Sequence, residues 1–503
     1  MDVLANLALG FGVALTLKNL AYCFLGVLLG TLIGVLPGVG PLVTIAMLLP
    51  ITFGLDPVSS LIMLAGIFYG AQYGGSTTAI LVNMPGEVSS AVTAIDGYQM
   101  ARQGRAGPAL ATAAMASFTA GILSTLVVAF FGPMVGHLAL EFGAAEYFSL
   151  MLMGLVFSAV LAHGDLVKSL AMVVVGLMLG LVGTDVTSGL PRFSFGVAEL
   201  LDGVGFTVVA VGLFAVSEIV LNLARSGPVE VFAKDVKDLM PTWADIKATA
   251  MPTLRGTALG SFFGALPGVT ASVASFSAYM LEKKLAKDPD RFGKGAIEGV
   301  AAPEAANNAA AQTHFIPTLT LGIPATAVMA LVLGALTMQG IQPGPQVMTT
   351  KPELFWGLVA SMFVGNVLLL VLNLPLVGVW ARLTQVPYRW LFPAILVFAS
   401  VGNYSLNNSA VDVYLCAAIG VLGYVFAKLE CQPAPLILGY VLGPMLEENL
   451  RRALLMSDGS FAVFVTRPIS LVFLAVSAAL LLAMVLPAVR RGRARATDDS
   501  EAG

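Results

Sequence analysis

Hydrophobic positions along the chain form long runs in which charged residues are nearly absent, and short polar stretches separate these runs. A helix that crosses a membrane needs about 20 predominantly apolar residues. Several of the runs are too short or too long for one straight crossing. The pattern therefore predicts an all-α polytopic membrane protein with about 10–14 membrane segments, some of them re-entrant hairpins or broken helices.

Two polar stretches, residues 225–255 and 282–298, carry clustered lysine and arginine, which is typical of cytoplasmic segments. The apolar run at 253–281 lies between them. If both flanks are cytoplasmic, this run enters and leaves the membrane on the same side, so we expect a helical hairpin. The Leu-Pro-Gly triplet at 266–268 lies near its midpoint and is suited to form its tip.

The polar stretches and the two ends divide the chain into five parts. The first residues are mildly apolar and contain two glycines, which favours a helix along the membrane interface. The tail carries clustered arginine beside an apolar run, which favours the cytoplasmic side for the C-terminus. The predicted parts are an interfacial helix at 1–17, a first transport repeat at 18–224, a charged cytoplasmic connection at 225–252, a second transport repeat with C-terminal spans at 253–488, and a basic and acidic cytoplasmic tail at 489–503.

The composition agrees with a lipid environment. Of 503 residues only 11% are charged, against about 25% in soluble proteins, and 57% are hydrophobic. The three cysteines are odd in number and far apart, which excludes a disulfide scaffold. The net charge of −3 leaves no basic face for phosphates, so we expect no nucleic-acid partner.

The chain contains an internal repeat. GTLIGVLPGV at 30–39 matches GSFFGALPGV at 260–269 in six of ten positions, at an offset of 230 residues. Each copy is followed by a second stretch rich in small residues and proline, at 69–87 and 302–326. Weakly similar halves with broken apolar segments are typical of secondary transporters, which bind substrate where the repeats meet. We expect the halves to be inverted, which requires an odd number of crossings between the copies; for a single copy, close helix packing is the alternative.

Lysine and arginine are absent from the intervals that contain the repeat elements. These intervals are 19–101, 256–282 and 295–350. Backbone amides would have to hold an anionic substrate there, because proline starts a new helix whose first N–H groups attract carboxylates. We expect Gly40 and Pro41 to be the N-cap and first residue of the helix after the first tip. Thr270 is expected to cap the helix after the second tip with its side chain.

Neutral polar side chains supply further donors and acceptors at depths where an unpaired polar group is costly. They are Ser76, Thr77, Thr78, Asn83, Asn307 and Asn308. Glu304, with Asn307 or Asn308 and unwound carbonyls, is a candidate ligand of a coupled Na⁺. Glu304 or Glu298 is a candidate carrier of a coupled proton. No other cofactor and no metal site is expected.

Three further polar residues are interpreted one by one. His314 is a candidate substrate contact or proton carrier, with a structural role as the alternative. Glu87 and Asp96 are expected to lie outside the hydrocarbon layer.

Five long motifs resemble the large membrane subunit of the tripartite tricarboxylate transporter family. They lie at 30–53, 73–87, 96–110, 266–284 and 292–327, and the resemblance extends over nearly the whole chain. It implies a bacterial inner-membrane permease that imports carboxylates by ion-coupled transport. It also implies two partners, a small four-helix membrane subunit and a periplasmic solute-binding protein, and leaves a homo-oligomer open.

The same resemblance assigns residues to the substrate region. They are Pro37, Gly38, Val39 and Gly40 at the first tip, Pro267, Gly268, Val269 and Thr270 at the second, Gly75, Ser76, Thr77 and Thr78, and Asn307 with Asn308. The chain departs from the family pattern at Thr270, at 312–314 and at 325–326, all in the second half. Tricarboxylate is therefore a family label, and a dicarboxylate or an aromatic acid is equally compatible.

Other classes of function are disfavoured. The chain has no G-x-x-x-x-G-K-[ST] motif of an ATP-driven pump, and no H-E-x-x-H or G-x-S-x-G motif of an intramembrane enzyme. A passive channel would favour rings of charge or a symmetric carbonyl filter. An autonomous ion-coupled carboxylate symporter, working without a binding protein, is the alternative that differs only in its partners.

Overall fold

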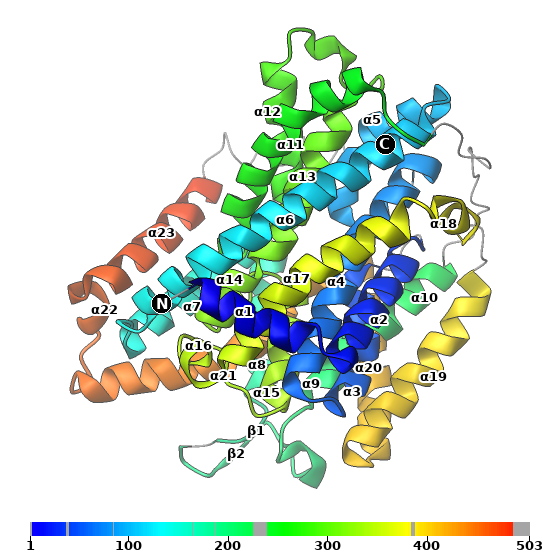
Figure 1. Cartoon of the computed structure of the whole chain (residues 1–503). Helices are drawn as coiled ribbons and strands as arrows, with labels where there is room; N and C mark the ends of the chain where they lie inside the picture. The colour runs from blue at the N-terminus through cyan, green and yellow to red at the C-terminus, as the bar shows by residue number, and fades with distance from the viewer. Residues whose placement is uncertain are drawn as a thin grey trace.

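The computed structural model describes residues 3–36, 40–83, 85–162, 164–185, 187–224, 239–383 and 388–485. The structure is 79% helical, so the predicted all-α class is confirmed. Two short antiparallel strands, β1 (Gly183–Thr184) and β2 (Pro191–Arg192), form a hairpin that projects below the helices in Figure 1. Residues 225–238 of the predicted connection at 225–252 and the whole predicted tail at 489–503 lie outside the described residues.

Helices occupy most of the first half. They are α1 (Val3–Ala14), α2 (Leu17–Gly34), α3 (Pro41–Phe53), α4 (Pro57–Val82), α5 (Ala91–Arg102), α6 (Ala106–Ala139), α7 (Ala144–Leu161), α8 (Leu166–Gly180), α9 (Phe206–Ala210) and α10 (Ser217–Ala224). Short 3₁₀ turns at Val88–Ser90 and Ala198–Leu200 and a π-helical stretch at Val211–Val216 connect some of them.

The second half repeats part of this order. Its helices are α11 (Trp243–Gly264), α12 (Ala271–Leu285), α13 (Glu298–Thr313), α14 (Phe315–Thr320), α15 (Ala327–Met338), α16 (Val347–Thr350) and α17 (Pro352–Asn373). A 3₁₀ turn at Pro289–Arg291 precedes α13. The C-terminal helices are α18 (Val377–Leu383), α19 (Tyr388–Asn407), α20 (Ala410–Lys428), α21 (Pro433–Met456), α22 (Val463–Thr466) and α23 (Pro468–Val485).

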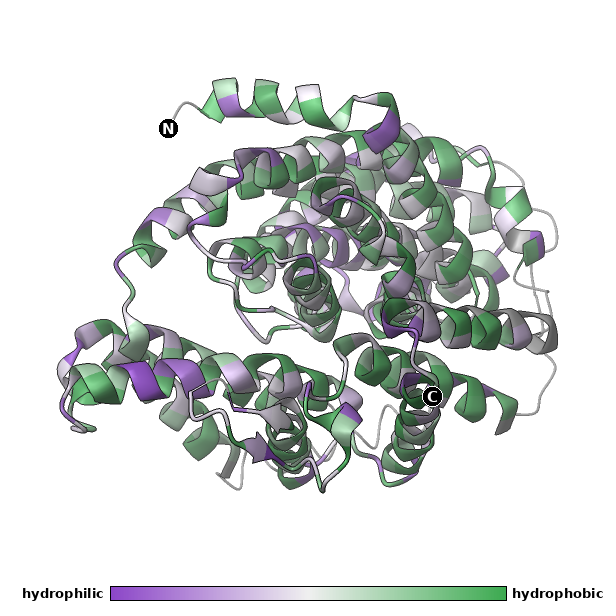
Figure 2. Cartoon of the chain, turned by 90° about the horizontal axis from the view of Figure 1, so that it is seen from below, coloured by the Kyte–Doolittle hydropathy of each residue, from purple (hydrophilic) through white to green (hydrophobic). Residues whose placement is uncertain are grey.

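The outer helices have the surface of a membrane protein. Among the described residues, six helices are long and apolar enough to cross a membrane, and five shorter helices are also apolar. Large apolar side chains such as Phe130, Val421 and Leu482 are more than half exposed. Figure 2 shows hydrophobic positions over most of the ribbon, with the N-terminal helix along one edge. These features confirm a polytopic helical membrane protein, while the number of crossings and the domain boundaries stay predictions.

In each half one helix packs closely against another through a stripe of glycines: α2 lies beside α4, and α11 beside α13 (Figure 1). A Cβ atom added to any glycine of either stripe would collide with a backbone carbonyl of the facing helix. In the first half Gly26, Gly30 and Gly34 of α2 face Met63, Ile67 and Ala71 of α4; in the second half Gly256, Gly260 and Gly264 of α11 face Ala302, Ala306 and Ala310 of α13. A spacing of four places each set on one helix face. The repeat found in the sequence is thus a repeated helix contact.

The segment predicted to be a hairpin consists of α11 and α12. The guanidinium of Arg255 on α11 donates to both carboxylate oxygens of Glu282 on α12, each at 2.6 Å, and this holds the two helices side by side. Residues 265–270 connect them, so the turn lies where the Leu-Pro-Gly triplet predicts it. How the hairpin lies in the membrane stays a prediction.

Candidate functional site

The helices α4 and α13 form the centre of the candidate site. Both are buried almost throughout, although both carry polar residues. Their partners α2 and α11 each have glycine at three positions of the contact, which lets the backbones approach closely. Alanine fills most of the remaining surface of α13. Because small residues let the neighbouring helices surround α4 and α13, the polar side chains of these two helices lie inside the protein.

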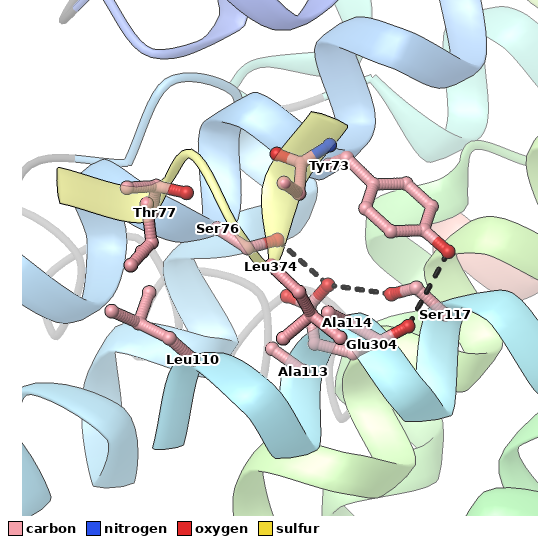
Figure 3. A pocket seen from close by; sticks show the side chains of 11 residues that line it. Tyr73, Ser76, Thr77, Leu110, Ala113, Ala114, Ser117, Glu304 and Leu374 are labelled. Carbon is pink, nitrogen blue, oxygen red and sulfur yellow. Dashed lines mark hydrogen bonds between the residues drawn. The ribbon is translucent and has the colours of Figure 1, made fainter. Parts of the chain in front are cut away.

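Glu304 of α13 is surrounded by hydroxyl groups from the first half. Ser76 of α4 donates to its carboxylate at 2.7 Å and Ser117 of α6 at 3.2 Å, as Figure 3 shows. Thr93 of α5 donates to the other carboxylate oxygen. Glu304 is 1% exposed and forms no ion pair with any described residue. Its charge is therefore met by neutral donors alone, which compensates a buried carboxylate only in part.

A small cavity adjoins this carboxylate, lined also by Tyr73 and Thr77 of α4 and by Leu374 (Figure 3). Its volume is about 20 Å³, which suits one water molecule or one small ion. Asn308 supports the cluster from α13, because its amide nitrogen donates to the Ser117 hydroxyl at 2.7 Å and to the Glu304 backbone carbonyl at 3.0 Å.

A second carboxylate, Glu87, lies next to the other asparagine. The amide nitrogen of Asn307 is 3.4 Å from Glu87 Oε1, and the Ser89 hydroxyl also contacts this oxygen. The Ser89 hydroxyl is 3.2 Å from Gln72 Oε1 on α4 as well. Consecutive asparagines of α13 thus belong to two different acidic clusters.

The second tip has no carboxylate of its own. Gly268 has φ +82°, a conformation that glycine adopts without strain, and its N–H donates to the Ala325 carbonyl at 2.9 Å. His314 donates through Nε2 to the Val269 carbonyl at 3.1 Å, so it ties the tip to the end of α13. This contact fits the structural alternative for His314, and a transport role stays a prediction.

Thr270 precedes α12, but the predicted side-chain cap is wrong. Its hydroxyl makes no capping hydrogen bond, and Oγ1 is buried without a partner among the described residues. Thr270 instead lines a cavity of about 90 Å³, together with Thr326 at the start of α15. Thr326 does cap its helix, because its hydroxyl accepts from the Met329 N–H at 3.3 Å. Two helix N-termini therefore meet at one cavity.

The remaining predicted residues are distributed around these clusters. Pro37, Gly38 and Val39 lie outside the described residues. Gly40 is the N-cap of α3 with Pro41 as its first residue, as expected. Gly75 faces the Ser90 hydroxyl, and Thr78 donates to the Gly75 carbonyl within α4. Pro267 is part of the second tip, and Asn83 is the exposed C-cap of α4 with φ +56°. Their roles in binding stay predictions.

Sequence reasoning missed several members of the clusters. Thr93 and Ser117 are single hydroxyls in helices of ordinary composition, so no local pattern distinguishes them. Glu87 follows the Pro-Gly pair that ends the first polar stretch, and this position was the available signal. Glu298 is ion-paired with Arg291 at 2.7 Å, which separates its surroundings from those of Glu304.

Asp96 is also buried, at 0% exposure. It accepts hydrogen bonds from the backbone N–H groups of Gly293, Gly295 and Ala296, each at 2.8 Å, and from the Tyr279 hydroxyl at 2.9 Å. These donors connect α5 of the first half to the segment before α13.

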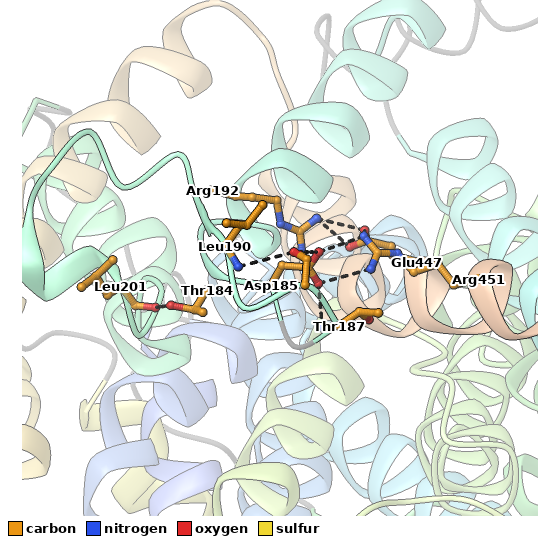
Figure 4. Close-up of polar contacts among 9 residues, drawn as sticks. Thr184, Asp185, Thr187, Leu190, Arg192, Leu201, Glu447 and Arg451 are labelled. Atoms are coloured by element: carbon orange, nitrogen blue, oxygen red, sulfur yellow. Dashed lines mark hydrogen bonds and ion pairs between the residues drawn. The ribbon is translucent and has the colours of Figure 1, made fainter.

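Acids near the β-hairpin are paired quite differently (Figure 4). Asp185 contacts Arg192 at 3.5 Å and Arg451 of α21 at 3.0 Å, and Glu447 contacts both arginines. The Thr187 N–H, the Ser188 hydroxyl and Arg451 together lower the pKa of Asp185 to about 2. Each acid here has a permanent cationic partner.

No lysine or arginine side chain is buried among the described residues, and these residues contain no group of three or more His, Cys, Asp or Glu that could hold a metal. Apolar outer helices thus enclose a polar centre in which a small solute or ion would meet only neutral groups and two carboxylates. This arrangement is that of a polytopic membrane transport protein.

Comparison with known proteins places the chain more closely. Residues 20–438 match the sequence profile of the "Tripartite tricarboxylate transporter TctA family", and the chain belongs to this family. The "uncharacterized 52.8 kDa protein in TAR-I ttuC' 3'region" of Agrobacterium vitis is 57% identical over 493 residues, covering 98% of each chain. An uncharacterized protein of the TAR-II ttuC' 3'region of the same organism is 56% identical over 234 residues, which is 46% of this chain and 97% of that protein. No solved structure matches the chain.

Proposed function

We propose that this chain is the permease subunit of a secondary transporter in the bacterial inner membrane. In this proposal it imports a small carboxylate, coupled to a Na⁺ or H⁺ gradient, together with a small membrane subunit and a periplasmic solute-binding protein. Membership in the tripartite transporter family supports the class and the existence of partner subunits. The substrate, the coupling ion and the partners are part of the proposal.

The observation that carries the anion site is the unpartnered hydroxyl of Thr270. It lines the cavity where α12 and α15 both begin. Each helix start carries a partial positive charge and backbone N–H groups that lack intrahelical acceptors. A volume of about 90 Å³ has room for several water molecules and hence for a carboxylate group. In the proposal one substrate carboxylate binds here, between Thr270 and Thr326.

Glu304 is the proposed site of ion coupling. Its hydroxyl donors come from α4, α5 and α6 of the first half, while Glu304 itself belongs to the second half. A cation bound at this carboxylate would neutralise it and link the two halves. Alternating access would then consist of a movement of the tip regions against the outer helices, with binding of anion and cation making the movement favourable.

Uptake by proteoliposomes tests the proposal. The full complex is reconstituted, and uptake of radiolabelled tricarboxylates, dicarboxylates and aromatic acids is followed under a Na⁺ gradient or a pH gradient. We expect uptake of one class to require one of the gradients and the binding protein. Uptake that continues with both gradients collapsed would refute ion coupling. Uptake that needs a gradient but no binding protein would instead support the autonomous symporter.

A matched pair of variants tests the anion site. Thr270→Val removes a hydroxyl that has no partner among the described residues, so the melting temperature should not fall. Uptake should fall about tenfold, the effect of losing one hydrogen bond of roughly 1.4 kcal/mol to an anion. Thr257→Val is the control, because Thr257 is a buried threonine of α11 that donates only to the Thr253 carbonyl of its own helix. Equal uptake by both variants would show that the cavity does not bind substrate.

A further inference from the structure

The oxygen atoms around Glu87 are only weakly satisfied by hydrogen bonds. The hydroxyl of Ser89 lies within hydrogen-bond distance of both Glu87 Oε1 and Gln72 Oε1, but a hydroxyl has only one proton to donate. The Asn307 amide reaches Glu87 at the long distance of 3.4 Å. If the Ser89 proton points to Gln72, Glu87 Oε1 keeps only the long contact with the Asn307 amide.

Two buried oxygens in the same place have no partner among the described residues. They are Asn307 Oδ1 and Ser90 Oγ, on side chains that are each 0% exposed. The Asn307 amide group lies against Glu87 through its nitrogen. Ser90 is close as well, because a Cβ built on Gly75 would be 3.0 Å from Ser90 Oγ and 3.4 Å from Glu87 Cγ. An unpaired buried oxygen costs about 1–3 kcal/mol, so two of them beside one carboxylate require a reason.

A small hard cation supplies that reason. Carboxylate, amide and hydroxyl oxygens are the ligands that such cations prefer. A proton on Glu87 would add only one donor, whereas a metal cation accepts electron pairs from several oxygens at once. The described residues contribute no lysine or arginine to this cluster. The cluster is thus better matched to Na⁺ than to H⁺.

We propose that Glu87, Gln72, Ser89, Ser90 and Asn307 form a Na⁺ site, separate from the Glu304 cluster. The proposal deepens the ion-coupled function proposed above, because it makes two cation sites in one chain. Asn307 and Asn308 are consecutive residues of α13 and serve one site each. Two bound cations repel each other directly, so positive cooperativity between them has to come from the substrate anion, which attracts both. Two monovalent cations would balance the charge of a dicarboxylate.

Sodium binding can be measured without transport. The purified full-length chain in detergent is titrated with NaCl against choline chloride at constant ionic strength, and its melting temperature is recorded. In Glu87→Gln the half-saturating Na⁺ concentration should rise at least about tenfold, because the only charged ligand of the site is lost. The control is Glu353→Gln, which changes an exposed acid at the start of α17 and should behave as the unaltered chain.

Transport by the complete complex provides the second measurement. The Hill coefficient for Na⁺ should be about 2 in the unaltered transporter and about 1 in Glu87→Gln. Ser90→Ala keeps the test decisive if Glu87→Gln folds poorly, since it removes an unpartnered hydroxyl and should weaken Na⁺ binding by about threefold without loss of stability.

The outcomes separate the two proposals. If Na⁺ raises the melting temperature of Glu87→Gln and Ser90→Ala as it does that of the unaltered chain, the Glu87 site is refuted while ion-coupled uptake can stand. If pH alone shifts the melting temperature and Na⁺ does not, the site is a proton site and the proposal is wrong. If the Na⁺ effect is lost in Glu87→Gln but uptake shows no dependence on a gradient, the site is supported and the proposed function fails.

Discussion

Acidic side chains have opposite kinds of partners in two regions of the molecule. Near the β-hairpin, Asp185 and Glu447 share two arginines, so the charges cancel within the folded chain (Figure 4). In the polar centre, Glu304 accepts hydrogen bonds from hydroxyl groups (Figure 3), and Glu87 lies beside a hydroxyl and an amide. Neither acid forms an ion pair with a described residue. In the first region the ion pairs are formed within the chain and need no ligand. The second is suited to a partner that arrives and leaves, which is what a coupled ion does.

Replacing the central acid should have the largest effect. In Glu304→Gln the amide keeps the size of the side chain but removes its charge. Loss of a buried charge partner is worth about 3 kcal/mol, so ion-coupled uptake measured below ion saturation should fall about 100-fold. The melting temperature should stay constant or rise, because an amide costs less to bury than a carboxylate.

Asp185, which is paired with two arginines, is the control for Glu304. Asp185→Asn leaves Arg192 and Arg451 without one of their acidic partners, so the melting temperature should fall. Uptake per folded molecule should not change. If Glu304→Gln destabilises the protein and leaves uptake intact, the difference between the two regions has no functional meaning.

A smaller effect is expected from substitutions in the glycine stripes, which test whether the two halves depend equally on close helix packing. In Gly30→Ala the new methyl group would collide with the Ile67 carbonyl, and in Gly260→Ala with the Ala306 carbonyl. Each substitution should cost about 2 kcal/mol of folding free energy, as overpacking usually does. Gly12→Ala is the control, since nothing lies within 4 Å of the added atom. Unequal costs in thermal or denaturant unfolding would show that the two halves are not packed alike.

The sequence predicted the helical membrane fold because hydrophobic runs and missing charges are properties of composition that any folded form must satisfy. It also predicted the turn at 266–268 and the N-cap at Gly40, since proline and glycine restrict the backbone locally. It could not predict that Thr93 and Ser117 donate to Glu304, because those contacts join residues about 200 positions apart. The Thr270 cap was wrong for a related reason: a threonine before a helix usually caps it, but here the side chain lines a cavity.

The smallest effect concerns pH at the paired acid. The pKa of Asp185 is lowered to about 2, from 3.8 in an ordinary aspartate. A lowered pKa contributes stability that is fully present above the ordinary value and is lost as the pH falls through the folded value. The difference in melting temperature between the unaltered chain and Asp185→Asn should therefore be constant from pH 7 down to about 5 and shrink between about pH 4 and 2. A difference that disappears already near pH 6 would mean that the ion pairs do not hold the carboxylate, and the region near the β-hairpin would then resemble the central one.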